Sequence, residues 1–129
     1  FVLKGILHPE DAEQARALGA DGVVVSNHGG RALDSSMATI DALPDIVAAV
    51  GGRMTLFLDS GIRRGSDVVK ALALGADAVL VGRAPLYGLA AAGEAGVMRA
   101  LALLQAETSR TMAMLGARSI AEIDASLLP

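Results

Sequence analysis

The chain has 129 residues, of which 53% are hydrophobic, 19% are charged and only 2% are aromatic. This length and composition indicate one globular domain with a sizeable core and exclude a disordered chain. The formal net charge of −3 leaves no basic surface of the kind that binds nucleic acid, and the absence of cysteine excludes disulfides and thiolate chemistry.

The expected elements alternate between strand and helix four times along the chain. The expected strands are short and apolar, and they cover residues 1–7, 23–26, 54–59 and 78–81. The expected helices follow them, at residues 9–18, 37–50, 66–74 and 94–115. Pro44 predicts an interruption of the second helix, with a short turn before the main helical segment. Residues 119–129 are expected to form a short turn of helix and a loose end.

An internal repeat supports this alternation. The segments ALGADGVVVS (17–26) and ALGADAVLVG (73–82) match at seven of ten positions and lie 56 residues apart, a distance of two strand–helix units. Apolar strands that alternate with helices predict a parallel sheet covered by helices on its outer face. The sequence therefore predicts an α/β fold of four βα units, half of a (β/α)8 barrel, which as a whole needs about 250 residues. The alternative is a small doubly wound sheet.

Polar residues near the first two strands indicate a site. Lys4 lies within an apolar strand, where an ammonium group needs an acceptor unless the strand is an exposed edge. Ser26, His28 and Arg31 follow the second strand in the segment SNHGGR. Histidine takes up a proton near neutral pH, and arginine grips a carboxylate through two parallel hydrogen bonds. A capped turn with a surface arginine is the alternative interpretation.

The third and fourth strands are followed by glycine and arginine. Asp59 ends the third strand, where it is well placed to orient a histidine, and begins the segment DSGIRRGSD (59–67). Gly82 and Arg83 follow the fourth strand. Glycine-rich turns with arginine bind anions through backbone N–H groups and guanidinium groups. Barrels build their sites at these strand ends, often with a phosphate site after the last two strands, which favours the half-barrel over the doubly wound sheet.

These segments resemble a known family. The segments LKG, GVVVSNHGGR, LDSGIRRGSDVVKALALGADAVLVGR and AAAGEAGV are similar to the C-terminal half of the FMN-dependent α-hydroxy-acid dehydrogenases and oxidases. That family includes glycolate oxidase, L-lactate dehydrogenase, lactate oxidase and (S)-mandelate dehydrogenase. The resemblance covers residues 2 to about 123, and its His-Gly-Gly-Arg motif is highly specific. Many members have glycine at the position of Ser60, and DSG with LYGLAA points toward mandelate- and lactate-dehydrogenase-like members.

The resemblance implies FMN as cofactor and a role for each matching residue. It implies that His28 is the catalytic base, that Arg31 holds the substrate carboxylate, and that Asp59 pairs with His28 and stabilises its protonated form. Lys4 would lie near the N1/O2 edge of the flavin, and Ser26 would contact the flavin. The ribityl chain and phosphate would lie against Ser60, Gly61, Ile62, Arg63, Gly82 and Arg83.

The implied function is FMN-dependent oxidation of a small (S)-2-hydroxy acid to the 2-oxo acid, with oxygen, a quinone or a cytochrome as electron acceptor. The alternatives are another FMN barrel, similar to type 2 isopentenyl-diphosphate isomerase or inosine-monophosphate dehydrogenase, and an inactive half-barrel. The sequence contains no apolar run near the ~18 residues of a membrane span. Cytoplasmic or peripherally membrane-associated localisation is therefore expected.

The resemblance also implies that residues 1–129 are half of an FMN-binding barrel whose N-terminal half is absent from this chain. Open parallel edges predict that the chain pairs with that half-barrel or with another copy of itself. The resemblance further implies a homo-oligomer, a tetramer in the parent enzyme.

Overall fold

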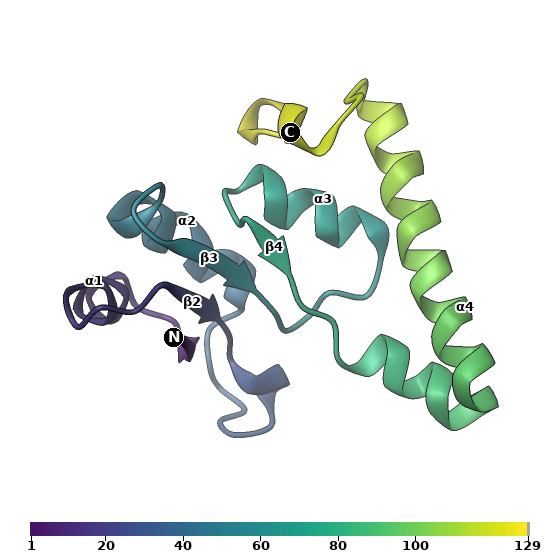
Figure 1. Ribbon diagram of the computed structural model, residues 1–129, viewed down its shortest axis with the longest axis horizontal. Helices are drawn as coiled ribbons and strands as arrows, with labels where there is room; N and C mark the ends of the chain where they lie inside the picture. The colour runs from purple at the N-terminus through teal and green to yellow at the C-terminus, as the bar shows by residue number, and fades with distance from the viewer. Residues whose placement is uncertain (129) are drawn as a thin grey trace.

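Four strands form one parallel sheet in the order β1-β2-β3-β4 in the computed structural model, which describes residues 1–128 (Figure 1). The strands are β1 (Val2–Ile6), β2 (Gly22–Val25), β3 (Thr55–Leu58) and β4 (Ala78–Val79). The helices are α1 (Pro9–Ala17), α2 (Thr39–Val50), α3 (Gly65–Ala73) and α4 (Arg83–Leu115). Short 3-10 turns lie at η1 (His28–Gly30), η2 (Ile120–Glu122) and η3 (Ala125–Leu127). The predicted order of four βα units, part of a (β/α)8 barrel, is confirmed.

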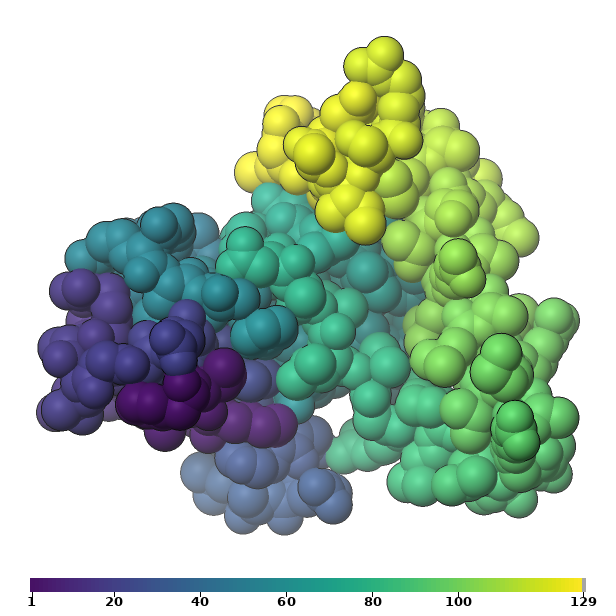
Figure 2. Space-filling model, viewed as in Figure 1, coloured from purple at the N-terminus to yellow at the C-terminus, as the bar shows by residue number. Residues whose placement is uncertain are grey.

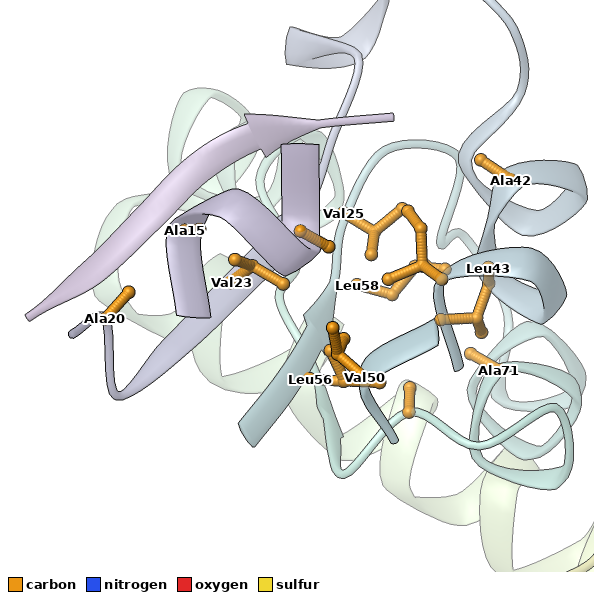
Figure 3. Packing of buried hydrophobic residues seen from close by; sticks show 13 residues of the cluster. Ala15, Ala20, Val23, Val25, Ala42, Leu43, Val50, Leu56, Leu58 and Ala71 are labelled. Carbon is orange, nitrogen blue, oxygen red and sulfur yellow. The ribbon is translucent and has the colours of Figure 1, made fainter. Parts of the chain in front are cut away.

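One face of the sheet packs against helices. Val23 pairs in register with Leu56 and Val25 with Leu58, and all four side chains are fully buried. They meet small side chains of α1 and large apolar side chains of α2, such as Leu43 (Figure 3). Because successive strand side chains point to opposite faces, these alternate residues form the core and their neighbours do not.

The other face carries a lysine. Lys4 pairs with Val24, Val24 with Phe57, and Phe57 with Ala78, so these four residues form one row across the sheet. The row belongs to the face opposite the helix-packed core. The register shifts after Lys4, and the residue in the shift is Gly5, with a left-handed φ of 103°. Lys4 therefore points away from the helix layer, near the carboxyl ends of the strands.

Helix α2 runs without interruption through Pro44, so the predicted break is wrong. Proline removes one backbone hydrogen bond from a helix and crowds the preceding turn. Leu43, Ile46 and Val50 are fully buried on the face of α2 that packs on the sheet. This burial compensates for the lost hydrogen bond, since each large apolar side chain contributes about 1.5–3 kcal/mol.

Helix α4 begins at Arg83, eleven residues before the predicted start at residue 94. Pro85 lies in its first turn, where a missing N–H has no cost. The helix breaks at Ala92 and Gly93, which have non-helical backbone angles, and Figure 1 shows the chain changing direction there. Gly88 and Gly96 then approach so closely that a side chain on either would collide with the backbone of the other. The predicted helix, residues 94–115, therefore corresponds to the second segment of a broken helix.

Helix α4 also differs from the expectation that the chain contains no apolar run near the length of a membrane span. By length and composition, α4 is the one helix in residues 1–128 that is apolar enough to cross a membrane. The segment after its break packs against α3 (Figure 1), and no residue of α4 is fully buried.

Asp21 and Asp77, the aspartates of the two repeated ALGAD sequences, form hydrogen bonds to the preceding strand. The Asp77 N–H donates to the Leu56 carbonyl at 2.8 Å, and the Leu56 N–H donates to Asp77 Oδ2 at 2.8 Å. The Asp21 N–H likewise donates to the Phe1 carbonyl, at 2.9 Å. Each aspartate thus bonds through its backbone to the start of the preceding strand, and Asp77 also does so through its carboxylate.

We expect Asp77→Ala to lower the free energy of unfolding by about 1–2 kcal/mol, because the buried strand β3 then has one N–H without its acceptor. Asp77→Asn is the matched control, since its amide oxygen can still accept that hydrogen bond. Urea denaturation measures both variants. Equal stability of Asp77→Ala and the unchanged protein would contradict this role.

Candidate active site

The predicted site residues converge at one end of the sheet. A cavity of about 490 Å³ lies beside the carboxyl ends of the strands. Figure 2 shows a hollow here between the β2–α2 loop (residues 26–38, blue) and the start of α4 (green). The structure brings together at this cavity nearly all of the predicted residues: Lys4, His28, Arg31, Asp59, Ser60, Gly61, Ile62, Arg63, Gly82 and Arg83.

Ser26 lies beneath the cavity instead of lining it. Its side chain is almost fully buried. Ser26 Oγ accepts a hydrogen bond from Lys4 Nζ at 2.7 Å and another from the His28 N–H at 3.1 Å. Ser26 therefore joins the lysine of β1 to the backbone of the β2–α2 loop.

Lys4 and Asp59 form the ion pair of the site. Lys4 Nζ lies 2.8 Å from Asp59 Oδ2, and the Asp59 side chain is only 18% exposed. Lys4 lies on the edge strand β1 and its side chain is 44% exposed, as the exposed-edge interpretation expected, and its ammonium group also finds acceptors in Asp59 and Ser26.

The protonation of Asp59 follows from this environment. Burial raises the pKa of Asp59, but hydrogen bonds with Lys4, Ser26 and Ser60 and the charge of Lys4 outweigh burial and hold that pKa below its ordinary value. Asp59 is therefore a carboxylate that only accepts hydrogen bonds. Within residues 1–128 no hydrogen bond joins Asp59 to His28, so the expected pairing of these two side chains stays a prediction.

His28 stands on a left-handed backbone turn. His28 has a φ of 57°, and Gly29 and Gly30 continue the turn with φ of 70° and 72°. Asn27 stabilises the turn, because its Oδ1 accepts from the Gly30 N–H at 3.1 Å and its Nδ2 donates to the Met37 carbonyl at 3.2 Å. Left-handed backbone is unfavourable for histidine, so the loop must be held by its surroundings.

The absence of a side chain at Gly5 leaves the space that the His28 imidazole occupies. A Cβ on Gly5 would lie 2.8 Å from His28 Cε1, so any side chain at residue 5 would displace the ring. Sequence reasoning did not single out Gly5 or Asn27. The glycine after Lys4 and the asparagine before His28 were the available signals.

Three arginines serve the site differently. Arg31 Nε donates to the His28 carbonyl at 3.3 Å, and no hydrogen bond within residues 1–128 engages its two Nη groups. Arg83 Nη2 donates to the Gly29 carbonyl. The Arg63 backbone N–H donates to Asp67 Oδ2 at 3.0 Å, and Arg63 is among the residues that line the cavity.

Thr39 is a further site residue that sequence reasoning missed. Its side chain is 2% exposed, and its Oγ1 donates to the Asp59 carbonyl at 2.7 Å, with the Ser60 carbonyl at 3.1 Å. The first residue of α2 thereby fixes the backbone at the end of β3. A threonine before an apolar helical run was the only sequence signal.

The cavity is strongly cationic. Lys4, Arg31, Arg63 and Arg83 line it, against the single carboxylate of Asp59. Ser60 and Gly61 give the loop after β3 two successive left-handed residues, with φ of 71° and 89°. Cations and an imidazole suit an anionic ligand that also exchanges a proton.

A comparison with protein families decides the relationship. The model of the FMN-dependent dehydrogenases matches residues 1–129. The chain belongs to this family.

Relatives of this FMN-dependent dehydrogenase chain act on named 2-hydroxy acids. It is 55% identical to the L-lactate oxidase of Nostoc sp. over 99% of this chain and 35% of the relative. It is 58% identical to an L-lactate dehydrogenase of Xanthomonas euvesicatoria pv. vesicatoria, over 99% of this chain and 33% of the relative. The chain therefore spans about a third of the length of these curated relatives.

Solved structures agree with this family assignment. A structure of an active mutant of (S)-mandelate dehydrogenase superimposes with a TM-score of 0.93 at 51% identity, over 98% of this chain and 35% of that chain. A mandelate oxidase structure with (S)-4-hydroxymandelic acid gives a TM-score of 0.90 at 53% identity, over 93% and 34% of the two chains. Another similar structure is described as the monotopic membrane protein (S)-mandelate dehydrogenase.

Proposed function

We propose that this chain is the C-terminal half-barrel of an enzyme that oxidises a small (S)-2-hydroxy acid of the lactate, mandelate or glycolate class to the 2-oxo acid. The observation that carries the proposal is the placement of His28, Arg31 and three further cationic residues, Lys4, Arg63 and Arg83, on one cavity. The names of the relatives, which are lactate and mandelate oxidases and dehydrogenases, support the substrate class.

The residues present fit FMN. The phosphate of FMN is an anion, and Arg63 and Arg83, which line the cavity, would offer it guanidinium donors. The ribityl chain and phosphate together would be held by residues 60–63, Gly82 and Arg83. Lys4 would place positive charge near the flavin ring, and Ser26, which bonds to Lys4, would contact the flavin.

The chain's own residues divide the chemistry between them. When bound, FMN would accept the two electrons and one of the two protons that the substrate loses on oxidation to the 2-oxo acid. Arg31 holds the substrate carboxylate through its two Nη groups. A nitrogen of the His28 imidazole accepts the proton that the substrate releases. Asp59, a carboxylate on the same cavity wall, stabilises the protonated imidazole.

The whole enzyme requires more than this chain. We propose that a complementary half-barrel, or another copy of the chain, covers the open sheet edges, and that the enzyme is a homo-oligomer such as a tetramer. The electrons pass on to oxygen, a quinone or a cytochrome. The enzyme lies in the cytoplasm or on a membrane surface.

The function is tested by flavin reduction in the full-length protein. We expect purified protein to carry FMN, and we expect anaerobic (S)-lactate or (S)-mandelate to bleach the flavin absorbance without any nicotinamide. The (R)-enantiomers serve as matched controls. A flavin that none of these acids bleaches would overturn the proposed reaction.

The cofactor site is tested separately, with two double variants. The double variant Arg63→Ala/Arg83→Ala should lose FMN on dialysis, whereas Arg64→Ala/Arg118→Ala, which removes two arginines outside the cavity, should retain it. Full flavin occupancy in the first double variant would place the phosphate elsewhere.

A further inference from the structure

Ser60 connects the loop that follows β3 to the β2–α2 loop. Its Oγ accepts a hydrogen bond from the Gly29 N–H at 3.0 Å, and its hydroxyl donates to Asp59 Oδ1 at 2.7 Å. Since Asp59 only accepts, the chain of bonds has one direction, from the Gly29 N–H through the Ser60 hydroxyl to the carboxylate. A residue next to the base is thus tied to the ion pair between Lys4 of β1 and Asp59, which directly follows β3.

This connection completes a clamp on His28. The His28 N–H donates to Ser26 Oγ, and the next N–H, that of Gly29, donates to Ser60 Oγ. Both serines lead to the Lys4–Asp59 ion pair, Ser26 through Lys4 and Ser60 through Asp59. Two consecutive peptide N–H groups are therefore fixed to one charged pair by two hydroxyl groups.

The backbone conformation at Ser60 favours glycine, so the serine hydroxyl is present at a conformational cost. Ser60 and His28 are the only residues other than glycine with positive φ in residues 1–128, at 71° and 57°. Such a conformation costs a non-glycine residue of order 1 kcal/mol, and glycine would adopt it freely. Glycine at residue 60 would relieve the strain, but it would also remove the bond to Gly29.

We propose that Ser60 is a positioning residue that holds the His28 imidazole in its working place by clamping the Gly29 N–H to Asp59. The inference rests on the proposed function, since it assigns His28 the role of base. Ser60 does not itself move the substrate's proton. It acts through the backbone of the His28 turn, which also carries the bond from Arg31.

The clamp itself is measured by amide hydrogen exchange in the full-length, FMN-loaded protein. We expect Ser60→Ala to raise the exchange rate of the Gly29 amide by about tenfold, the fold-change that corresponds to one lost hydrogen bond. Ser36→Ala is the matched control, because Ser36 lies in the same β2–α2 loop and its hydroxyl donates to the Leu33 carbonyl. Unchanged Gly29 exchange in Ser60→Ala would overturn the clamp, whatever reaction the enzyme performs.

The link to chemistry is measured by the rate constant of anaerobic flavin reduction by (S)-lactate or (S)-mandelate, whichever reduces the unmodified protein. We expect Ser60→Ala to lower this constant by roughly 5- to 20-fold at full amplitude, whereas simple misfolding would lower the amplitude alone. In a His28→Gln background the same change should have almost no further effect. A full additional loss there would show that Ser60 acts independently and would overturn the positioning role. Absence of reduction in the unmodified protein would overturn that role together with the proposed function, while the exchange result would still decide the clamp.

Discussion

Replacing His28 with glutamine is expected to lower turnover of the full-length enzyme by roughly 10²–10⁴-fold, the usual effect of losing a general base. Glutamine has a similar reach but cannot accept a proton near neutral pH. The backbone of residue 28 is held by Ser26 and its neighbour Gly29 by Ser60, so the turn should persist and FMN should remain bound. Stopped-flow measurement of flavin reduction gives the rate constant directly.

The second histidine of the chain is the matched control for this change. His8 precedes α1 and makes no side-chain cap to that helix. We expect His8→Gln to leave the reduction rate unchanged. A near-normal rate in His28→Gln would remove His28 from the role of base and leave the imidazole a part of the loop only.

Arg31→Lys is expected to lower kcat/KM for a 2-hydroxy acid by about 10- to 100-fold. Lysine keeps the positive charge but loses the planar pair of donors, so it cannot bind both carboxylate oxygens in parallel. It also loses the Nε donor that reaches the His28 carbonyl. Both substrate binding and the rate of reduction should therefore suffer, and titration of flavin reduction against substrate concentration separates the two.

Arg118→Lys controls for the chemical change itself. Arg118 pairs with Glu122 near the C-terminal end of the chain, away from the cavity. Its replacement should leave kcat/KM as it is. If Arg31→Lys also leaves the kinetics unchanged, then the substrate carboxylate binds to another group.

The sequence by itself determined the order of the elements and the end of the sheet at which the site lies. Apolar strands that alternate with helices leave little choice but a parallel sheet, and the carboxyl ends of parallel strands meet at one edge. Polar residues just after the strands, such as His28, Asp59 and Arg83, were therefore predicted to converge, and they line one cavity. The two ALGAD segments also marked equivalent places, since the Asp21 and Asp77 N–H groups each donate to a carbonyl at the start of the preceding strand.

Only the tertiary structure decided which groups pair within that site. The register of β1 beside β2 brings Lys4 to Asp59, and Ser60 joins Asp59 to the His28 turn, two contacts that the sequence did not predict. The place of the imidazole beside Gly5 and the continuity of α2 through Pro44 likewise depend on packing between distant segments. Local sequence determines which conformations a segment prefers. The choice among hydrogen-bond partners depends on distances of a few tenths of an ångström between strands, and the folded sheet alone sets these distances.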